Sequence, residues 1–342
     1  MNAIAYQLEP QRGLAGLTAR PQEIPAPGPH QVLVRVRAAG LNRRDIMLMD
    51  GTYPLAARPG VAPLSDGVGE VVAVGDGVIR AAVGDRVTGT YFLGWNDGPQ
   101  TQALITQQYG ATHDGWLAEY ILLEEDSVVH APAHLTDAEA ATLTCAGVVA
   151  WSALTTPAPV RPGETVLTVG TGTVALFAIQ YAAMLGARVI SVTSTADKAE
   201  RLRKLGSDEV IDRTEWPDWE NPVLELTGGD GVQHVIDAVG PPTLPKSLAA
   251  STYNARVSLI GAFAAEPGRQ LADPFGGKYL SIRRPAVGSR ADFEAMNHAI
   301  AEHGLHPVID RQFPVDQAVD AYRYFTEGNP FGKVVVTFPQ ER

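Results

Sequence analysis

The chain has 342 residues, of which 45% are hydrophobic and 19% charged, and its formal net charge at pH 7 is −11. This length is enough for two domains with sizeable cores, and these fractions are those of an ordinary soluble globular protein. The negative charge argues against a nucleic-acid partner, because phosphate binding needs a basic surface, and no apolar stretch approaches the length of a membrane span.

Two further features bear on where the protein works. The N-terminus lacks a basic segment followed by an apolar core, so we expect no secretory signal and a cytoplasmic location. Cys145 is the only cysteine, which makes a disulfide within the chain impossible.

The first part of the chain is predicted to be rich in β-strands. Residues 31–38 alternate apolar and charged side chains, which is typical of a half-buried strand. Further strands are predicted at 67–74, near 83–87 and from 115 to about 123. The polar stretch 91–112 has no periodicity and predicts a long loop. Short strands separated by glycine turns indicate a compact, barrel-like domain.

Near Pro132 the composition changes, and strands and helices begin to alternate. Thr136 is predicted to cap a helix, because Glu139 follows three residues later and an apolar run comes after it. Beyond this helix, strands are predicted at 166–169, 188–193, 209–211, 234–237, 256–261 and 281–287, with helices between them.

The first of these strands leads into a glycine turn and then a helix. Residues 166–169 are a β-branched run that ends at Gly170-Thr171-Gly172, and an apolar helical pattern follows from 174 to 185. Gly170 permits a tight turn, Gly172 lets backbone approach a phosphate, and Ala175 allows close packing of helix on strand. The N-terminus of such a helix attracts a pyrophosphate, so we predict a dinucleotide-binding site.

The end of the second strand, at 188–193, bears on which dinucleotide binds. Folds that prefer NAD usually carry Asp or Glu there, whereas this chain has Ser194 and Thr195. Their hydroxyls can donate to a 2′-phosphate, and Lys198 can neutralise it, with Arg213 as a further cation nearby. We therefore expect NADP(H) in preference to NAD(H). The alternative is that Thr195 caps the next helix and Lys198 is solvated surface.

After Gly288 the pattern changes once more. A helix is predicted at 292–302, a strand near 308–310, a helix at 316–326 and a final strand at 333–338. This tail is too short for a domain of its own, so we expect it to return and complete the β-rich domain.

Taken in order, several stretches resemble the medium-chain dehydrogenase/reductase superfamily, and the resemblance covers nearly the whole chain. The stretches are GLNRRD (40–45), GTYP (51–54), LSDGVGEVVAVG (64–75), VGDRV (83–87), GTGTVA (170–175) and GKVV (332–335). The resemblance implies an α/β fold with a discontinuous GroES-like β-rich catalytic domain, residues 1–128 and 290–342. Residues 129–289 are then a Rossmann domain with a doubly wound parallel sheet, and a homodimer is the expected assembly.

The superfamily has a zinc branch and a zinc-free branch that includes quinone oxidoreductases and enoyl reductases. Zinc members place Cys where this chain has Asn42, and His-Glu where it has Ser65-Asp66, and their structural zinc uses four cysteines. Cys145 matches one catalytic cysteine, but a single soft ligand does not assemble a site that needs three protein ligands. The sequence therefore predicts no metal and places the chain in the zinc-free branch.

Without a metal, a conjugated acceptor is the easier target for a hydride, because the negative charge moves to an oxygen held by hydrogen-bond donors. The resemblance implies Asn42 beside the nicotinamide and Tyr53 as a residue that either donates a proton or only binds substrate. The alternative for Asn42 is a turn residue in the left-handed conformation, and for Tyr53 a packing role. Asp45 is expected to brace the loop.

The resemblance also implies the residues that line the cofactor and the substrate. For the cofactor they are Gly170, Thr171, Gly172, Thr173, Val174, Ala238, Val239, Gly240, Gly261, Ala262, Phe263, Gly288, Ser289 and Lys333, in addition to Ser194, Thr195, Lys198 and Arg213. Lys333 is otherwise an ordinary lysine at a strand end. Phe92, Trp95, Trp116 and Cys145 are expected either to line an apolar substrate site or to belong to the core.

The leading hypothesis is therefore a zinc-independent, NADPH-dependent oxidoreductase that transfers hydride to an enone, enal or quinone, a small and apolar or conjugated substrate. Two alternatives stand beside it. One is a reversible alcohol/ketone dehydrogenase, and the other is a catalytically idle NADPH-binding protein.

Overall fold

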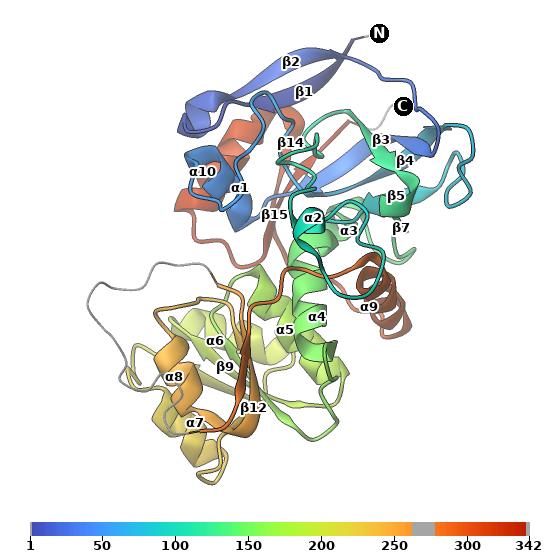
Figure 1. The fold of residues 1–342 in the computed structure, drawn as a ribbon. Coiled ribbons are helices and arrows are strands. Elements are labelled where there is room, and N and C mark those ends of the chain that lie inside the picture. The colour runs from blue at the N-terminus through green and yellow to red at the C-terminus, as the bar shows by residue number, and fades with distance from the viewer. Residues whose placement is uncertain (1, 262–277, 340–342) are drawn as a thin grey trace. The chain divides into compact units, whose positions relative to one another are not determined.

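The computed structural model describes residues 2–261 and 278–339, and the chain divides into two compact units (Figure 1). The first unit is Met1–Val148 with Val287–Arg342, and the second is Val149–Ala286. The boundary near residue 148 lies later than the predicted one at 128, because α3 (Asp137–Ala140) packs against strands of the first unit. Thr136 caps this helix as predicted, with its side chain accepting a hydrogen bond from the Glu139 N–H.

The first unit is built on a seven-stranded sheet with the order β14-β15-β3-β4-β5-β7, in which β6 also pairs with β3. Its strands are β3 (Gln31–Gly40), β4 (Asp66–Val74), β5 (Arg86–Gly89), β6 (Tyr120–Glu124), β7 (Val128–His130), β14 (Ile309–Pro314) and β15 (Lys333–Thr337). Because β15 pairs with β3, the C-terminal segment completes the sheet that the N-terminal segment begins.

A separate two-stranded sheet of β1 (Asn2–Leu8) and β2 (Leu17–Glu23) covers part of this unit, and sequence patterns did not predict it. Besides α3, the helices of the first unit are α1 (Arg43–Asp50), α2 (Gln102–Ile105), α9 (Arg290–Glu302) and α10 (Ala318–Glu327). The predicted strand from Gly115 begins only at Tyr120, because the N–H groups of Gly115, Trp116 and Leu117 bond to carbonyls at 62–64.

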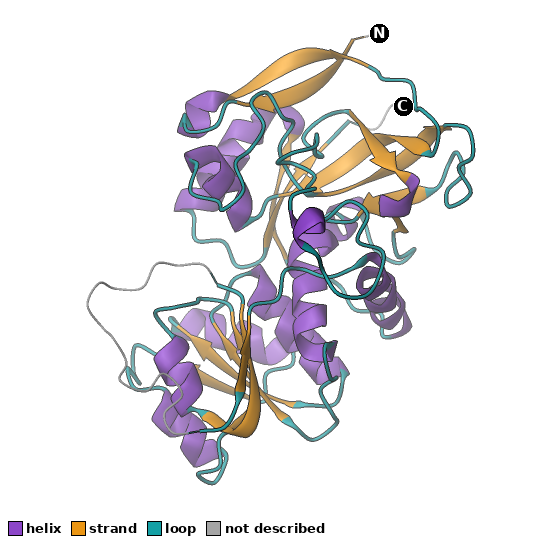
Figure 2. Ribbon diagram, in the orientation of Figure 1, coloured by secondary structure: helices purple, strands orange, loops and turns teal. Residues whose placement is uncertain are grey.

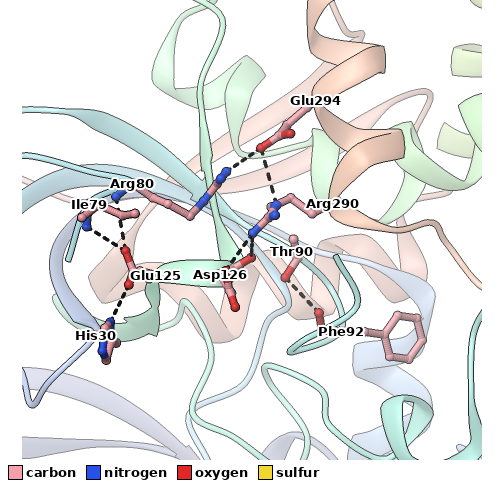
Figure 3. Close-up of polar contacts among 9 residues, drawn as sticks. All are labelled: His30, Ile79, Arg80, Thr90, Phe92, Glu125, Asp126, Arg290 and Glu294. Carbon is pink, nitrogen blue, oxygen red and sulfur yellow. Dashed lines mark hydrogen bonds and ion pairs between the residues drawn. The ribbon is translucent and has the colours of Figure 1, made fainter. Parts of the chain in front are cut away.

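Helix α9 is attached to the first unit by ion pairs at its N-terminal half (Figure 3). Arg80 and Arg290 both approach Glu294 Oε1, at 2.6 and 3.6 Å, and Arg290 also pairs with Asp126 at 3.1 Å. The Arg290 N–H donates to the Trp95 carbonyl at 2.9 Å. Residues after 289 therefore pack with the β-rich unit, as the sequence predicted.

The second unit is a six-stranded sheet with the order β10-β9-β8-β11-β12-β13, and every pairing in it is parallel (Figure 2). Its strands are β8 (Thr165–Val169), β9 (Arg188–Thr193), β10 (Glu209–Asp212), β11 (Val232–Asp237), β12 (Ser251–Leu259) and β13 (Ser281–Arg283). Its helices are α4 (Val148–Thr155), α5 (Thr173–Met184), α6 (Ala196–Lys204), α7 (Glu220–Leu226) and α8 (Leu244–Ala249). Numbered along the chain, this is the order 3-2-1-4-5-6 of a dinucleotide-binding Rossmann fold.

Two details complete the comparison with the sequence. The strand predicted at 281–287 ends at Arg283, so Gly288 and Ser289 do not terminate a strand. Among the residues that the structure describes, no helix is long and apolar enough to cross a bilayer.

Candidate functional site

Three neighbouring strands of the first unit bring a buried ion pair to Asn42. Gly40 at the end of β3 lies opposite Asp66 of β4 and Val335 of β15, and Asn42 caps α1 directly after β3. Lys333 Nζ donates to Asp66 Oδ2 at 2.8 Å, to Asn42 Oδ1 at 2.7 Å and to the Leu41 carbonyl at 3.0 Å. Both ionic side chains are completely buried.

This arrangement corrects the expectation that Lys333 reaches a phosphate or ribose. An ammonium group has three N–H donors, and all three are occupied inside the first unit. The alternative of an ordinary strand-end lysine is also wrong, since such a side chain is normally solvated. Lys333 is a structural cation that neutralises Asp66 and orients Asn42.

The amide of Asn42 is oriented by the same contact. Because Oδ1 accepts from Lys333, Nδ2 is left as a buried donor, and it has no partner among the described residues. The backbone of Asn42 is extended, with φ −132°, so the left-handed alternative does not apply. Asp45 Oδ2 accepts from the Asn42 N–H at 2.7 Å, which is the bracing role expected of it, and burial raises the pKa of Asp45 to about 6.

Tyr53 belongs to a hydroxyl cluster that sequence patterns did not reveal. Its hydroxyl lies 2.9 Å from the hydroxyl of Tyr91 and 3.4 Å from Gln108 Oε1. The buried guanidinium of Arg44 lies over both rings, 4.6 Å from the centroid of Tyr91 and 5.5 Å from that of Tyr53. Tyr53 is half-buried and Tyr91 is buried, so Tyr53 is the outer member of the pair.

The predicted substrate-lining residues separate into two groups. Phe92 packs edge-on against Tyr91 and Trp95, with centroid separations of 4.7 and 5.8 Å, and so adjoins the hydroxyl cluster. Trp116 is fully buried in the core and packs on Gly67, where a Cβ would lie 2.3 Å from the indole, so its expected role in lining a substrate site is wrong.

Cys145 lies in a single π-helical turn, Leu143–Gly147, and is partly exposed. Burial of the sulfur raises the pKa of its thiol to about 12, with the Asp66 carboxylate contributing. A thiol of this kind stays protonated near neutral pH and is a poor nucleophile.

The glycine turn of the second unit has the form that a pyrophosphate site requires. Gly170 has φ +103°, which only glycine adopts without strain, and Gly172 is the N-cap of α5. A Cβ at Gly172 would meet no described atom within 4 Å, so the space beside the helix N-terminus is open. Thr171 lies in this turn and Thr173 and Val174 begin the helix after it, and their contact with a cofactor stays a prediction.

Two further loops meet this turn at the carboxyl end of the sheet. Gly261 follows β12, and a Cβ there would lie 2.0 Å from the Val239 carbonyl carbon, so the close approach of the two loops requires glycine. Asp237, which sequence analysis did not single out, ends β11 and accepts from the N–H groups of Val239 and Gly240 at 3.1 and 2.8 Å. This carboxylate holds the Ala238–Gly240 loop in place.

The end of β9 carries the expected polar groups. Lys198 Nζ donates to Thr171 Oγ1 at 3.3 Å, so this cation lies beside the glycine turn. Thr195 is exposed and is the N-cap residue of α6, and Ser194 precedes it. Arg213 is exposed after β10, and its N–H bonds to the Thr193 carbonyl next to Ser194.

For four predicted cofactor residues the structure shows no place beside this turn. Ala262 and Phe263 fall outside the described residues. Gly288 and Ser289 belong to the first unit, where the Ser289 hydroxyl caps α9 by accepting from the Asp292 N–H at 3.1 Å. Their expected place beside the nicotinamide stays a prediction.

Comparisons with known proteins agree with this architecture. The family model described as an alcohol dehydrogenase GroES-like domain matches residues 28–133, and that described as a zinc-binding dehydrogenase matches 173–302. A zinc-type alcohol dehydrogenase-like protein of Schizosaccharomyces pombe is 38% identical, over 93% of this chain and 94% of its own length. An acryloyl-coenzyme A reductase of Metallosphaera sedula is 28% identical, over 94% of this chain and 96% of its own length.

Solved structures give the same relationship. A putative alcohol dehydrogenase from Sinorhizobium meliloti has a TM-score of 0.90 and 36% identity, covering 99% of this chain and all of its own. A Pseudomonas syringae quinone oxidoreductase has a TM-score of 0.82, and a mycobacterial protein complexed with NADPH has 0.80. Both are 28% identical and cover 98% of this chain and 99% of their own.

Proposed function

The chain belongs to the medium-chain dehydrogenase/reductase superfamily and is an oxidoreductase, and we propose that it transfers hydride from NADPH to an activated double bond or a quinone without zinc. The observation that carries this proposal is Asn42, an oriented amide donor at the place where zinc relatives have a metal-binding cysteine. The hydroxyl of Tyr53 adds a second donor in the same unit.

The donor set does not fit a zinc ion. A catalytic zinc site needs three protein ligands, and in the described part of the chain no three His, Cys, Asp or Glu side chains are placed to hold a metal. Asn42 Oδ1 is engaged by Lys333, and Ser65 donates its hydroxyl to Asp66 at 2.8 Å. No step proposed here runs through a metal.

The residues of the second unit fit a phosphorylated dinucleotide. The turn at Gly172 would hold the pyrophosphate, and the Val239 and Gly261 loops would pass beside the nucleotide. Lys198, Ser194 and Thr195 would hold the 2′-phosphate, because one cation and two hydroxyls lie where NAD-binding folds carry a carboxylate. When bound, NADPH supplies the hydride.

The residues of the chain then act on the acceptor oxygen. Asn42 Nδ2 and the Tyr53 hydroxyl donate hydrogen bonds to the oxygen on which negative charge develops. Such donors accelerate a reaction when they are fixed before it begins, and Lys333 fixes Asn42 in this way.

A homodimer is the assembly we propose, and sedimentation velocity measures it directly.

Exchange of Lys198 for alanine tests the cofactor preference. We expect the Kd for NADPH to rise about tenfold while the Kd for NADH changes less than twofold, because Lys198 would pair with the 2′-phosphate alone. Fluorescence titration of both cofactors measures this. Lys204→Ala, at an exposed lysine paired with Glu200, is the matched control. Equal losses for both cofactors would contradict the assignment.

Prolonged chelation tests the absence of zinc chemistry. We expect the rate of NADPH oxidation after dialysis against a strong chelator to equal that of untreated protein within experimental error. Metal analysis should find well under one zinc per chain. Loss of turnover that added Zn²⁺ restores would refute a metal-free reaction.

The acceptor itself is tested by an NADPH-oxidation screen over enones, enals, quinones, ketones and alcohols. Turnover of enones or quinones, with none of simple alcohols, supports the proposal. The zinc-type alcohol dehydrogenase-like relative favours alcohol/ketone oxidoreduction as the second candidate, and the opposite pattern would select it. Cofactor binding with no turnover of any acceptor would favour an idle NADPH-binding protein.

A further inference from the structure

A buried cation lies next to Tyr53, and among the described residues it is hydrogen-bonded to a carbonyl and an amide rather than to a carboxylate. Arg44 is 6% exposed, and its guanidinium donates to the Tyr109 carbonyl at 2.9 Å and to Gln108 Oε1 at 3.1 Å. Its Nε has no hydrogen-bond partner among the residues described. Asp45, the adjacent acid, is turned instead toward the Asn42 N–H. The Asp45 carboxylate therefore acts on Arg44 only through space, and the guanidinium keeps an unused N–H donor beside the Tyr53 and Tyr91 rings.

The hydrogen bonds around Tyr53 have a definite direction. Gln108 Nε2 donates to the Ile105 carbonyl at 2.6 Å, which leaves Oε1 as an acceptor facing Arg44 and Tyr53. When Tyr53 donates, toward Gln108 or toward a ligand, its oxygen is free to accept from the Tyr91 hydroxyl 2.9 Å away. Tyr91 is therefore placed to stabilise a Tyr53 oxygen that has given up its proton.

Resting on the proposed function, we propose that Arg44 and Tyr91 are positioning residues that make the Tyr53 hydroxyl the proton donor to the acceptor oxygen. As hydride forms the new C–H bond at the β-carbon of an enone, the π electrons move to the carbonyl oxygen. The Tyr53 O–H bond breaks and its proton joins that oxygen to give the enol, which becomes the ketone in water. Solvent then restores the proton to Tyr53.

The cation is placed to stabilise the charge left on Tyr53. During the step the Tyr53 oxygen is negative, the Tyr91 hydroxyl donates to it, and the Arg44 guanidinium lies over both rings. The other titratable groups with electrostatic influence on this cluster are Asp45 and Cys145. Because burial raises the pKa of Cys145 to about 12, the thiol adds no charge near neutral pH.

The kinetic test compares Arg44→Met, Arg44→Lys and Tyr91→Phe. We expect Arg44→Met to lower kcat for an enone about 10- to 100-fold with KM within threefold, and Arg44→Lys to restore most of it, because general acid catalysis depends on the retained charge. Tyr91→Phe keeps the ring and loses only the hydroxyl, and should lower kcat about tenfold. Arg20→Met, at an exposed arginine, controls for the change in net charge.

An equilibrium readout that needs no turnover separates this inference from the proposed function. The probe is 4-nitrophenol, whose ionised form absorbs visible light and mimics an acceptor oxygen carrying negative charge. We expect a larger fraction of the probe to be ionised when it is bound to wild-type protein than in free solution. Arg44→Met should abolish this difference.

Each outcome decides one of the two claims. If wild-type protein turns over neither enones nor quinones, the proposed function fails, and the probe still reports on the cluster. If Arg44→Met does not fold, Tyr91→Phe provides the test, because this substitution removes only the hydroxyl oxygen and keeps the ring. Unchanged kcat in Tyr91→Phe, or a wild-type protein that does not favour the ionised probe, would overturn the inference.

Discussion

Replacement of Lys333 by methionine is expected to lower the free energy of unfolding by about 3–5 kcal/mol, the usual cost of removing one partner of a buried ion pair. The substitution leaves the carboxylate of Asp66 without its cation in a site closed to water. It also removes the donor that holds Asn42 Oδ1, so turnover should fall together with stability. Urea unfolding followed by circular dichroism measures the first effect.

A second substitution separates lost charge from lost packing. In the double variant Lys333→Met with Asp66→Asn, no buried charge is left unpaired, and we expect part of the stability to return. Lys204→Met, at an exposed lysine, is the control for loss of a surface charge. If the free energy of unfolding of Lys333→Met lies within about 1 kcal/mol of the wild-type value, the buried ion pair contributes little to stability.

Replacement of Asn42 by alanine should have the largest effect on activity that leaves the fold intact. We expect kcat to fall about 10²- to 10³-fold, the range found when one fixed donor to a developing oxyanion is removed. Lys333 keeps Asp66 Oδ2 and the Leu41 carbonyl as acceptors, so stability should change much less than in Lys333→Met. Steady-state kinetics with the best acceptor from the screen and thermal unfolding measure the two effects.

The control for this substitution is Asn221→Ala, at an exposed position on α7. It removes the same amide from a helix of the second unit and should leave kcat unchanged. If Asn42→Ala and Tyr53→Phe both turn over at the wild-type rate, the assignment of this site is wrong.

The sequence by itself determined most of the second unit. The strand predicted at 188–193 is β9, and the run at 166–169 and the helix from 174 match β8 and α5 to within one residue at their starts. These elements follow from local information, because apolar periodicity and a glycine turn act over a few neighbouring residues. The parallel direction of the strands follows once strands and helices alternate, whereas their order is seen only in the structure.

The first unit and its chemistry depended on tertiary structure. Lys333 meets Asn42 and Asp66 across 291 and 267 positions of the chain, and only the pairing of β15 with β3 and of β3 with β4 brings them together. Nothing local in the sequence distinguishes this buried lysine from a solvated one at a strand end.

The hydroxyl cluster shows the same limit. Tyr53 was singled out from its motif, but Arg44, Tyr91 and Gln108 converge on it from separate segments. Trp116, expected to line a substrate site, is instead core because Gly67 leaves room for its indole. Residue type and spacing therefore determined which chemistry was available. The burial and partners that decide what each group does come from contacts between distant segments, which no local pattern encodes.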